Sequence, residues 1–268
     1  MALRLLYRSA MVPRLPRSLS LVLILLIFAS RQAAAMPVLD QTDTSIDYRI
    51  EKLTEANRDL TSRFGGPEIA LLEKLNRADA KHLQRLTQLV VPSSWRSELA
   101  HSPFPPTYTA ASATPKVLIV DQPSQAFAAY EYGEQVYWGP ISSGRQAKPT
   151  PSGVYHLNWR ARSRTSTLSG EWRLNWYFNF HNTRGLAFHE FDLPGVPQSH
   201  ACVRLLARDA EWVYKWGESW TLDVKGQLDA PGTPVLIIGS YAFESPAPWQ
   251  DAAYSTRKIA LPEAFPGR

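Results

Sequence analysis

The chain has 268 residues, of which 44% are apolar and 20% are charged, a balance that is typical of a globular protein and excludes a disordered one. Its formal net charge of +5 comes from the first 35 residues, which hold five Arg and no acidic residue, so that 24 basic and 24 acidic residues remain after them. The charge therefore gives no support for a nucleic-acid partner, and we expect none.

Residues 1–35 have the pattern of an export signal. Arginines precede an apolar core at 19–29, and Ala33–Ala35 supply small residues for cleavage. The core is shorter than the roughly 20 residues that a membrane-spanning helix needs. Cleavage after Ala35 would place the protein in the periplasm or cell envelope. An uncleaved anchor is the alternative, favoured by Arg31 after the core, and it would be the protein's one membrane contact.

Residues 36–99 are predicted to form a mainly helical region. A first amphipathic helix, ended by Gly65 and Gly66, is predicted from apolar residues at near-helical spacing. These are Ile46, Ile50, Leu53 and Leu60. Pro67 and Glu68 suit the first turn of a second helix, and TQLVVP (87–92) predicts a short strand.

The stretch LNRADAKHLQRLTQLVVP (75–92) resembles the second half of a LysM-like peptidoglycan-binding module. A helical packing region without a ligand is the alternative. Residues 100–115 are rich in Pro, Ser, Thr and Ala and have no period, which predicts a linker or a strap over the next domain.

Residues 116–241 are predicted to form a mainly β domain, a sandwich or a barrel. Runs of β-branched and aromatic residues such as KVLIVD, QAFAAYEYGEQVYWGPIS and LNWYFNF are separated by Gly, Pro, Asp and Asn. RDAEWVYKWGESW (208–220) predicts one late helix, and GTPVLIIGSY (232–241) predicts a final buried strand. Residues 242–268 have no period and are expected to form a surface tail.

The only cysteine of the chain, Cys202, lies in HEFDLPGVPQSHACVRLL (189–206). His200 is two residues away, on the same face of an extended segment, and His189 can reach the thiol if the Pro-Gly loop folds back. A neighbouring imidazole makes a thiol with a free pKa of about 8.5 a competent nucleophile. A helix start after Cys202 would add N–H groups that favour a thiolate and an oxyanion.

Other interpretations of these residues stay open. A lone thiol in an oxidising compartment can be buried and inert, or paired between chains. Two His and one Cys can also bind zinc, although no fourth ligand is evident nearby. We expect neither a metal nor a cofactor.

Two ordered motifs resemble the L,D-transpeptidase catalytic domain family, which has the YkuD-type fold. AFHEFDLPGVPQSHACVRL (187–205) resembles the active-site signature of that family, a His, a loop and Ser/Thr-His-Gly-Cys followed by an apolar residue and Asn or Arg. VYWGPISSGRQAKPTPSGVYHL (136–157) is similar to its other recurring stretch, with Ser-Ser-Gly at 142–144 and Thr-Pro-Ser-Gly at 150–153. The likeness runs from about Lys116 to Tyr241.

The resemblance implies that Cys202 is the nucleophile and that His189 is the general base, oriented by the backbone carbonyl of Glu190. Backbone N–H groups around Ala201 and Cys202 would form the oxyanion hole. The remaining matching positions, which would shape the loop or contact the substrate, are Ser199, His200, Arg204, Ser143 and Gly144.

The implied substrate is a peptidoglycan stem peptide. The thiolate would attack the carbonyl of the third residue, expel the terminal D-alanine, and pass the acyl group to an amine of a second stem or of an acceptor protein. Transfer to water would instead make a carboxypeptidase or amidase. A non-catalytic wall-binding protein is the remaining alternative. Carbapenems acylate this family, so Cys202 would capture one.

Two positions depart from the family pattern. Ala201 stands where Gly is usual, and at a positive φ its methyl group would cost roughly 1 kcal/mol. Glu190 stands where a small residue is usual, and its carboxylate would raise the pKa of the Cys202 thiol if it pointed inward.

Overall fold

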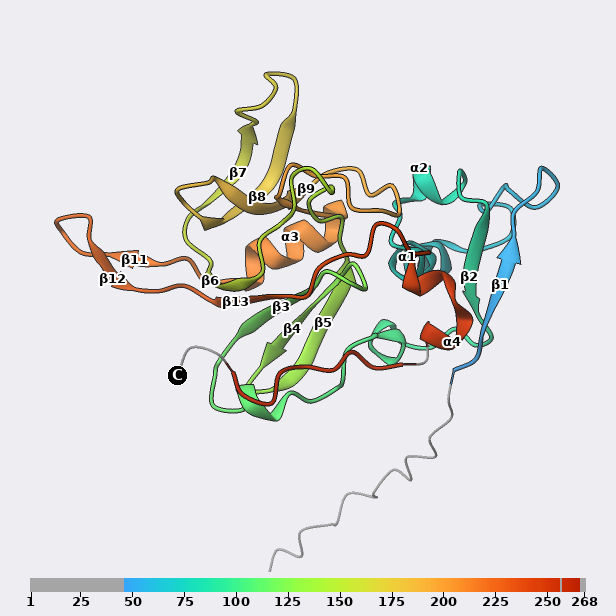
Figure 1. Ribbon diagram of the computed structural model, residues 1–268, viewed down its shortest axis with the longest axis horizontal. Helices are drawn as coiled ribbons and strands as arrows, with labels where there is room; N and C mark the ends of the chain where they lie inside the picture. The colour runs from blue at the N-terminus through green and yellow to red at the C-terminus, as the bar shows by residue number, and fades with distance from the viewer. Residues whose placement is uncertain (1–45, 256, 266–268) are drawn as a thin grey trace, which may run out of the picture. The chain divides into compact units, whose positions relative to one another are not determined.

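The computed structural model describes residues 46–255 and 257–265, all within one compact unit, Thr44–Arg268 (Figure 1). The predicted export signal, residues 1–35, lies outside the described residues. Within the described part of the chain, no helix combines the length and the apolar character needed to cross a membrane.

Two sheets form the body of the unit (Figure 1). The larger has the strand order β5-β4-β3-β13-β6. Its strands are β3 (Val117–Asp121), β4 (Ala126–Glu131), β5 (Glu134–Pro140), β6 (Gly153–His156) and β13 (Pro234–Ile238). The smaller has the order β10-β9-β8-β7. Its strands are β7 (Arg160–Thr165), β8 (Arg173–His181), β9 (Leu186–Glu190) and β10 (Val203–Leu205).

Strand β3 is the centre of the larger sheet. Its sequence VLIVD is buried at every position, as expected for a β-branched strand that is covered on both faces. It pairs antiparallel with β4 and parallel with β13. The parallel pair places Val235 opposite Leu118, so it joins segments more than a hundred residues apart in the sequence.

An apolar core fills the space between the two sheets. Helix α3 (Ala207–Trp216) lies in this layer and packs on β8 and β9 (Figure 1). Both sheets and the helix contribute fully buried side chains, among them Val120, Phe178, Phe188, Val213 and Val235. The predicted mainly β fold with one helix after Cys202 is confirmed. A short hairpin, β11 (Thr221–Leu222) and β12 (Leu228–Ala230), follows that helix.

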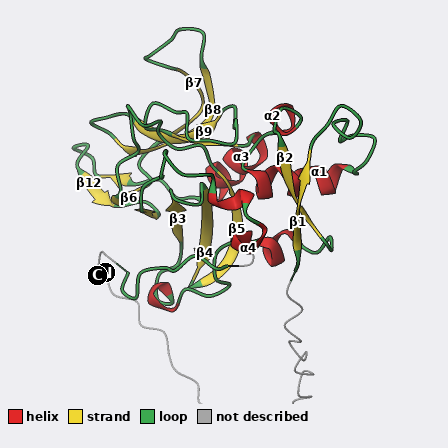
Figure 2. Ribbon diagram, turned by 45° about the vertical axis from the view of Figure 1, so that its right-hand side comes forward, coloured by secondary structure: helices red, strands yellow, loops and turns green. Residues whose placement is uncertain are grey.

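The N-terminal region is a two-stranded antiparallel sheet with two helices between its strands in the sequence (Figure 2). Its elements are β1 (Tyr48–Lys52), α1 (Gly66–Asn76), α2 (Ala80–Leu83) and β2 (Gln88–Pro92). The second predicted helix and the predicted strand are confirmed as α1 and β2. Helix α1 begins where the Glu68 carboxylate accepts a hydrogen bond of 2.8 Å from the Gly65 N–H, which supplies a partner for an otherwise free donor.

The first predicted helix is wrong, because residues 48–52 form strand β1. Every residue of β1 pairs with β2, with Ile50 opposite Val90. A turn follows, in which the Asn57 side chain accepts a hydrogen bond of 2.6 Å from the Thr54 N–H, a local bond that competes with helix formation. Pairing with a strand forty residues later therefore overrides the near-helical apolar spacing.

Residues 100–115 form a strap on the larger sheet. Phe104 and Tyr108 belong to a buried cluster on the face of that sheet away from α3. The strap begins within the 3-10 turn η1 (Glu98–His101) and contains η2 (Thr109–Ala111). The tail after residue 242 contains η3 (Pro248–Gln250) and α4 (Ala252–Ser255). It is more than a surface tail, because Trp249 is only 2% exposed.

Two buried cationic side chains of the N-terminal region, Lys74 and Arg77, bind groups of the larger sheet and of its β3–β4 connection. The Lys74 ammonium donates a hydrogen bond of 2.8 Å to the Trp138 carbonyl and lies 4.4 Å from the ring centroid of Tyr137. The Arg77 guanidinium donates one of 2.8 Å to the Ser124 carbonyl. A buried charge that loses its partners costs about 3–5 kcal/mol, so these contacts oppose separation of the two parts.

Candidate active site

Cys202 lies where the loop after β9 returns to begin β10. It lines two cavities of about 50 and 180 Å³. Both cavities are lined by residues of the β7–β8 hairpin and of the loop before Cys202. Residues that line both cavities, besides Cys202, are Ser166, Leu168, Leu174 and His200. The thiol can therefore be approached from two sides.

His189 lines the smaller of these cavities together with Cys202. It lies on β9, next to Arg204 of β10 in the strand register. Its Nδ1 is 2.9 Å from the Glu190 carbonyl oxygen. Because a carbonyl only accepts hydrogen bonds, Nδ1 carries the proton and Nε2 keeps its lone pair. This is the carbonyl contact that the family resemblance implies, and it leaves Nε2 able to take a proton.

The histidine and the thiol are both neutral at pH 7. Burial lowers the pKa of His189 to about 4, against a raising effect of its bond to Glu190. Burial also raises the pKa of Cys202, against the lowering effects of a backbone hydrogen bond from Ala187 and of the Arg204 charge. The pair is thus an uncharged imidazole and thiol at rest, and a thiolate forms only when the proton moves.

The loop before the cysteine is held in a strained conformation. Ala201 has a φ of 78°, in the left-handed region where a residue with a Cβ costs roughly 1 kcal/mol more than Gly. Its carbonyl accepts a hydrogen bond of 3.1 Å from the Thr150 hydroxyl. The Ser199 hydroxyl donates one of 2.5 Å to the Cys202 carbonyl. Two side-chain hydroxyls therefore hold the backbone on either side of the nucleophile.

Ser143 and Gly144 lie beneath this loop and line neither cavity beside Cys202. The Ser143 carbonyl accepts a hydrogen bond of 3.0 Å from the Ser199 N–H, and Gly144 forms a bridge with Ser199. The Ser143 hydroxyl is fully buried and accepts one of 2.8 Å from the Gln125 amide. These contacts place both residues in support of the loop, and their predicted contact with the substrate stays a prediction.

His200 and Arg204 take part in the cavity wall. The ring of His200 lies 5.7 Å from that of Trp172. The Arg204 guanidinium lies 4.5 Å from the ring centroid of Phe191 and donates a hydrogen bond of 3.3 Å to the Asp192 carbonyl. Both positions can meet a substrate, whereas Ala201 is buried and offers only its backbone.

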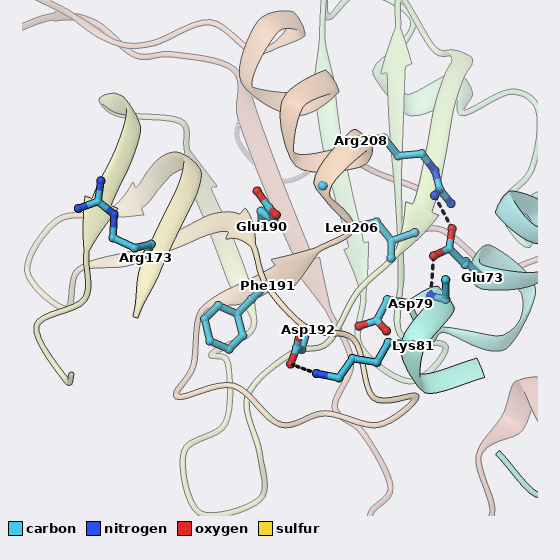
Figure 3. Close-up of a pocket in the computed structure, with 11 residues that line it drawn as sticks. Glu73, Asp79, Lys81, Arg173, Glu190, Phe191, Asp192, Leu206 and Arg208 are labelled. Carbon is cyan, nitrogen blue, oxygen red and sulfur yellow. Dashed lines mark hydrogen bonds and ion pairs between the residues drawn. The ribbon is translucent and has the colours of Figure 1, made fainter. Parts of the chain in front are cut away.

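The Glu190 side chain points away from the thiol, into a third cavity of about 540 Å³. It accepts a hydrogen bond of 3.1 Å from the Asn175 amide. Figure 3 shows Glu190 in this cavity, together with two ion pairs among the lining residues, one between Lys81 and Asp192 and one between Arg208 and Glu73. The carboxylate therefore does not raise the pKa of Cys202. The departure from the family pattern at Glu190 thus leaves the thiol unaffected.

Several cavity residues were not identified from the sequence. They are Leu168, Leu174 and Phe191 on the walls. Arg160, Arg162 and Arg164 lie in strand β7, and Arg164 lines the larger cavity beside Cys202. Among residues 46–255 and 257–265, no group of three or more His, Cys, Asp or Glu is placed to hold a metal ion.

A mainly β domain with a cysteine and a histidine in one cleft matches a known family. Residues 115–237 match the family model of the YkuD L,D-transpeptidase catalytic domain. The predicted resemblance to this family is thereby confirmed for residues 115–237.

Similar solved structures include three L,D-transpeptidases. The enzyme (Yku) from Stackebrandtia nassauensis is 23% identical, with 53% of this chain and 63% of that chain covered and a TM-score of 0.41. An enzyme from Mycobacterium tuberculosis H37Rv is 24% identical, with 47% and 58% covered and a TM-score of 0.37. L,D-transpeptidase 3 from M. tuberculosis, in complex with a faropenem-derived adduct, is 21% identical, with 47% and 60% covered and a TM-score of 0.37. The matched region spans about three fifths of each of these chains. No curated protein matches this chain significantly.

Proposed function

We propose that this protein is an exported L,D-transpeptidase that acts on peptidoglycan stem peptides in the periplasm or cell envelope. The observation that carries the proposal is the neutral pair of His189 and Cys202 in one cavity, with His189 Nε2 free to accept a proton. The match of residues 115–237 to the YkuD family supports the substrate class.

In the first half of the proposed reaction, Cys202 attacks the carbonyl of the third stem residue. The thiol proton moves to His189 Nε2, the S–C bond forms, and the carbonyl electron pair moves to oxygen. Collapse of this oxyanion breaks the C–N bond, and D-alanine leaves with the proton returned by His189. Because both groups start neutral, no ion pair has to be desolvated when the substrate enters.

In the second half, an amine attacks the thioester. His189 takes the amine proton, the C–S bond breaks, and the thiolate is reprotonated. The acceptor is a second stem, which gives a cross-link between third residues, or a lysine of an acceptor protein. Attack by water at the same step would instead make the protein a carboxypeptidase. Cys202 lines two cavities, so one can hold the acyl donor and the other the acceptor.

The test is intact mass spectrometry and product analysis with a disaccharide-tetrapeptide that contains diaminopimelate. We expect release of D-alanine, a cross-linked dimer, and addition of one imipenem molecule at Cys202. The control is Cys202→Ala, which keeps the fold and should lose all three. Release of D-alanine without a dimer would indicate hydrolysis, and activity retained in Cys202→Ala would refute the proposal.

A further inference from the structure

The hydroxyl of Thr150 makes two hydrogen bonds under the catalytic loop. It donates to the Ala201 carbonyl at 3.1 Å and accepts from the Gly144 N–H at 2.8 Å. Thr150 is only 3% exposed and lines neither cavity beside Cys202. Its hydroxyl therefore acts on the backbone and does not meet a substrate.

The direction of one hydrogen bond sets the direction of the neighbouring N–H. The described residues contain no cis peptide bond, and in a trans peptide the C=O and the following N–H point to opposite sides. Thr150 holds the Ala201 oxygen on the buried side of the loop. The Cys202 N–H consequently points to the other side, on which Cys202 lines the cavities.

This arrangement needs support, because Ala201 is in the left-handed region. A residue with a Cβ keeps such a φ only when its surroundings hold it there. The hydrogen bond from Ser199 to the Cys202 carbonyl fixes the next peptide. The bond from Thr150 fixes the peptide that carries the Cys202 N–H.

We propose that Thr150 is a positioning residue, whose hydroxyl turns the Ala201–Cys202 peptide so that the Cys202 N–H donates to the oxyanion formed during acyl transfer. This inference rests on the proposed function. The oxyanion appears when the S–C bond forms and the carbonyl pair moves to oxygen, and it disappears when the leaving amine departs. A donor fixed at this position stabilises that state more than the ground state.

The test compares two reactions of the same thiol in the full-length protein. Acylation by imipenem passes through an oxyanion, whereas alkylation by iodoacetamide is a substitution at saturated carbon and forms none. Thr150→Val keeps the shape and removes the hydroxyl, and Thr150→Ser keeps the hydroxyl. The matched control is Ser152→Ala, because the Ser152 hydroxyl also donates to a carbonyl, that of Gly239 at 2.6 Å, away from the loop.

We expect Thr150→Val to slow acylation by about 100-fold, the lower end of the effect of losing one oxyanion donor, and to leave alkylation within about two-fold. Thr150→Ser should restore acylation, and Ser152→Ala should resemble the wild type. Thermal unfolding checks that each variant is folded. If Thr150→Val does not fold, Thr150→Ala replaces it in the same comparison.

Three results would overturn the assignment. Acylation unchanged in Thr150→Val would show that the hydroxyl does not position a donor, while the proposed function would stand. An equal loss of acylation and alkylation would show that Thr150 only keeps the thiol in place. A wild-type protein that is alkylated but never acylated would refute the proposed function and the oxyanion role together.

Discussion

Gly144 is predicted to be intolerant of a single added methyl group. A Cβ at this position would lie 2.2 Å from the Lys148 carbonyl oxygen, 2.5 Å from the Thr150 nitrogen and 2.7 Å from the Pro149 carbonyl carbon. All three atoms belong to the backbone, so no side chain can swing away. Gly144→Ala must therefore move the segment that carries Thr150.

The cost can be worked from these contacts. Ordinary contact begins near 3.4 Å, so the segment must move by more than 1 Å. Overpacking of this kind costs about 1–3 kcal/mol, and losing the hydrogen bond from the Gly144 N–H to the Thr150 hydroxyl adds about 1 kcal/mol. A total of about 3 kcal/mol corresponds to a fall in Tm of about 10 °C for a unit of this size.

The assay is thermal unfolding followed by circular dichroism, with the rate of imipenem acylation measured on the same samples. Gly66→Ala is the control, because a Cβ there would meet no atom within 4 Å. We expect Gly144→Ala to lose stability and acylation together, and Gly66→Ala to change neither by much. A Gly144→Ala variant within about 1 kcal/mol of the wild type would refute the packing argument.

Two further predictions concern pH. The pKa of His189 falls to about 4 on folding, from about 6.5 in an unfolded chain, so between these values the unfolded state binds more protons and stability is lost as the pH falls. The contribution of His189 to the free energy of unfolding over this range is roughly 3 kcal/mol. His189→Gln should therefore reduce the dependence of the urea-unfolding free energy on pH between 6.5 and 4, and an unchanged slope would contradict the assignment. Because burial raises the pKa of Cys202, its alkylation by iodoacetamide should be slow at pH 7 and still rise with pH above 9, and a plateau below pH 7 would reveal a thiolate at rest.

The meeting of His189 and Cys202 in one cavity was predictable from the sequence. Both residues lie in one segment with a Pro-Gly loop between them, so the chain has few other ways to fold there. The direction of the Glu190 side chain was also implicit, because consecutive residues of a strand point to opposite faces. His189 faces the thiol cavity, so Glu190 faces the other one.

The supporting contacts were not predictable in the same way. Gly144 and Thr150 are more than fifty residues before Cys202, and their effect depends on one carbonyl direction and on the φ of Ala201. No local pattern encodes such a direction. Strand β1 was missed for a related reason, since its partner β2 follows forty residues later and the intervening spacing is nearly helical.

The parallel pairing of β3 with β13 has a consequence for the order in which the protein matures. Strand β13 emerges near the end of synthesis, and only then can β3 acquire its second neighbour. A sheet that needs a strand so distant in the sequence is completed late, and its folding is slow. The core beneath the smaller sheet includes Val235 of β13 beside Phe188 and Val203, so that core is completed only after Cys202 is already part of the chain.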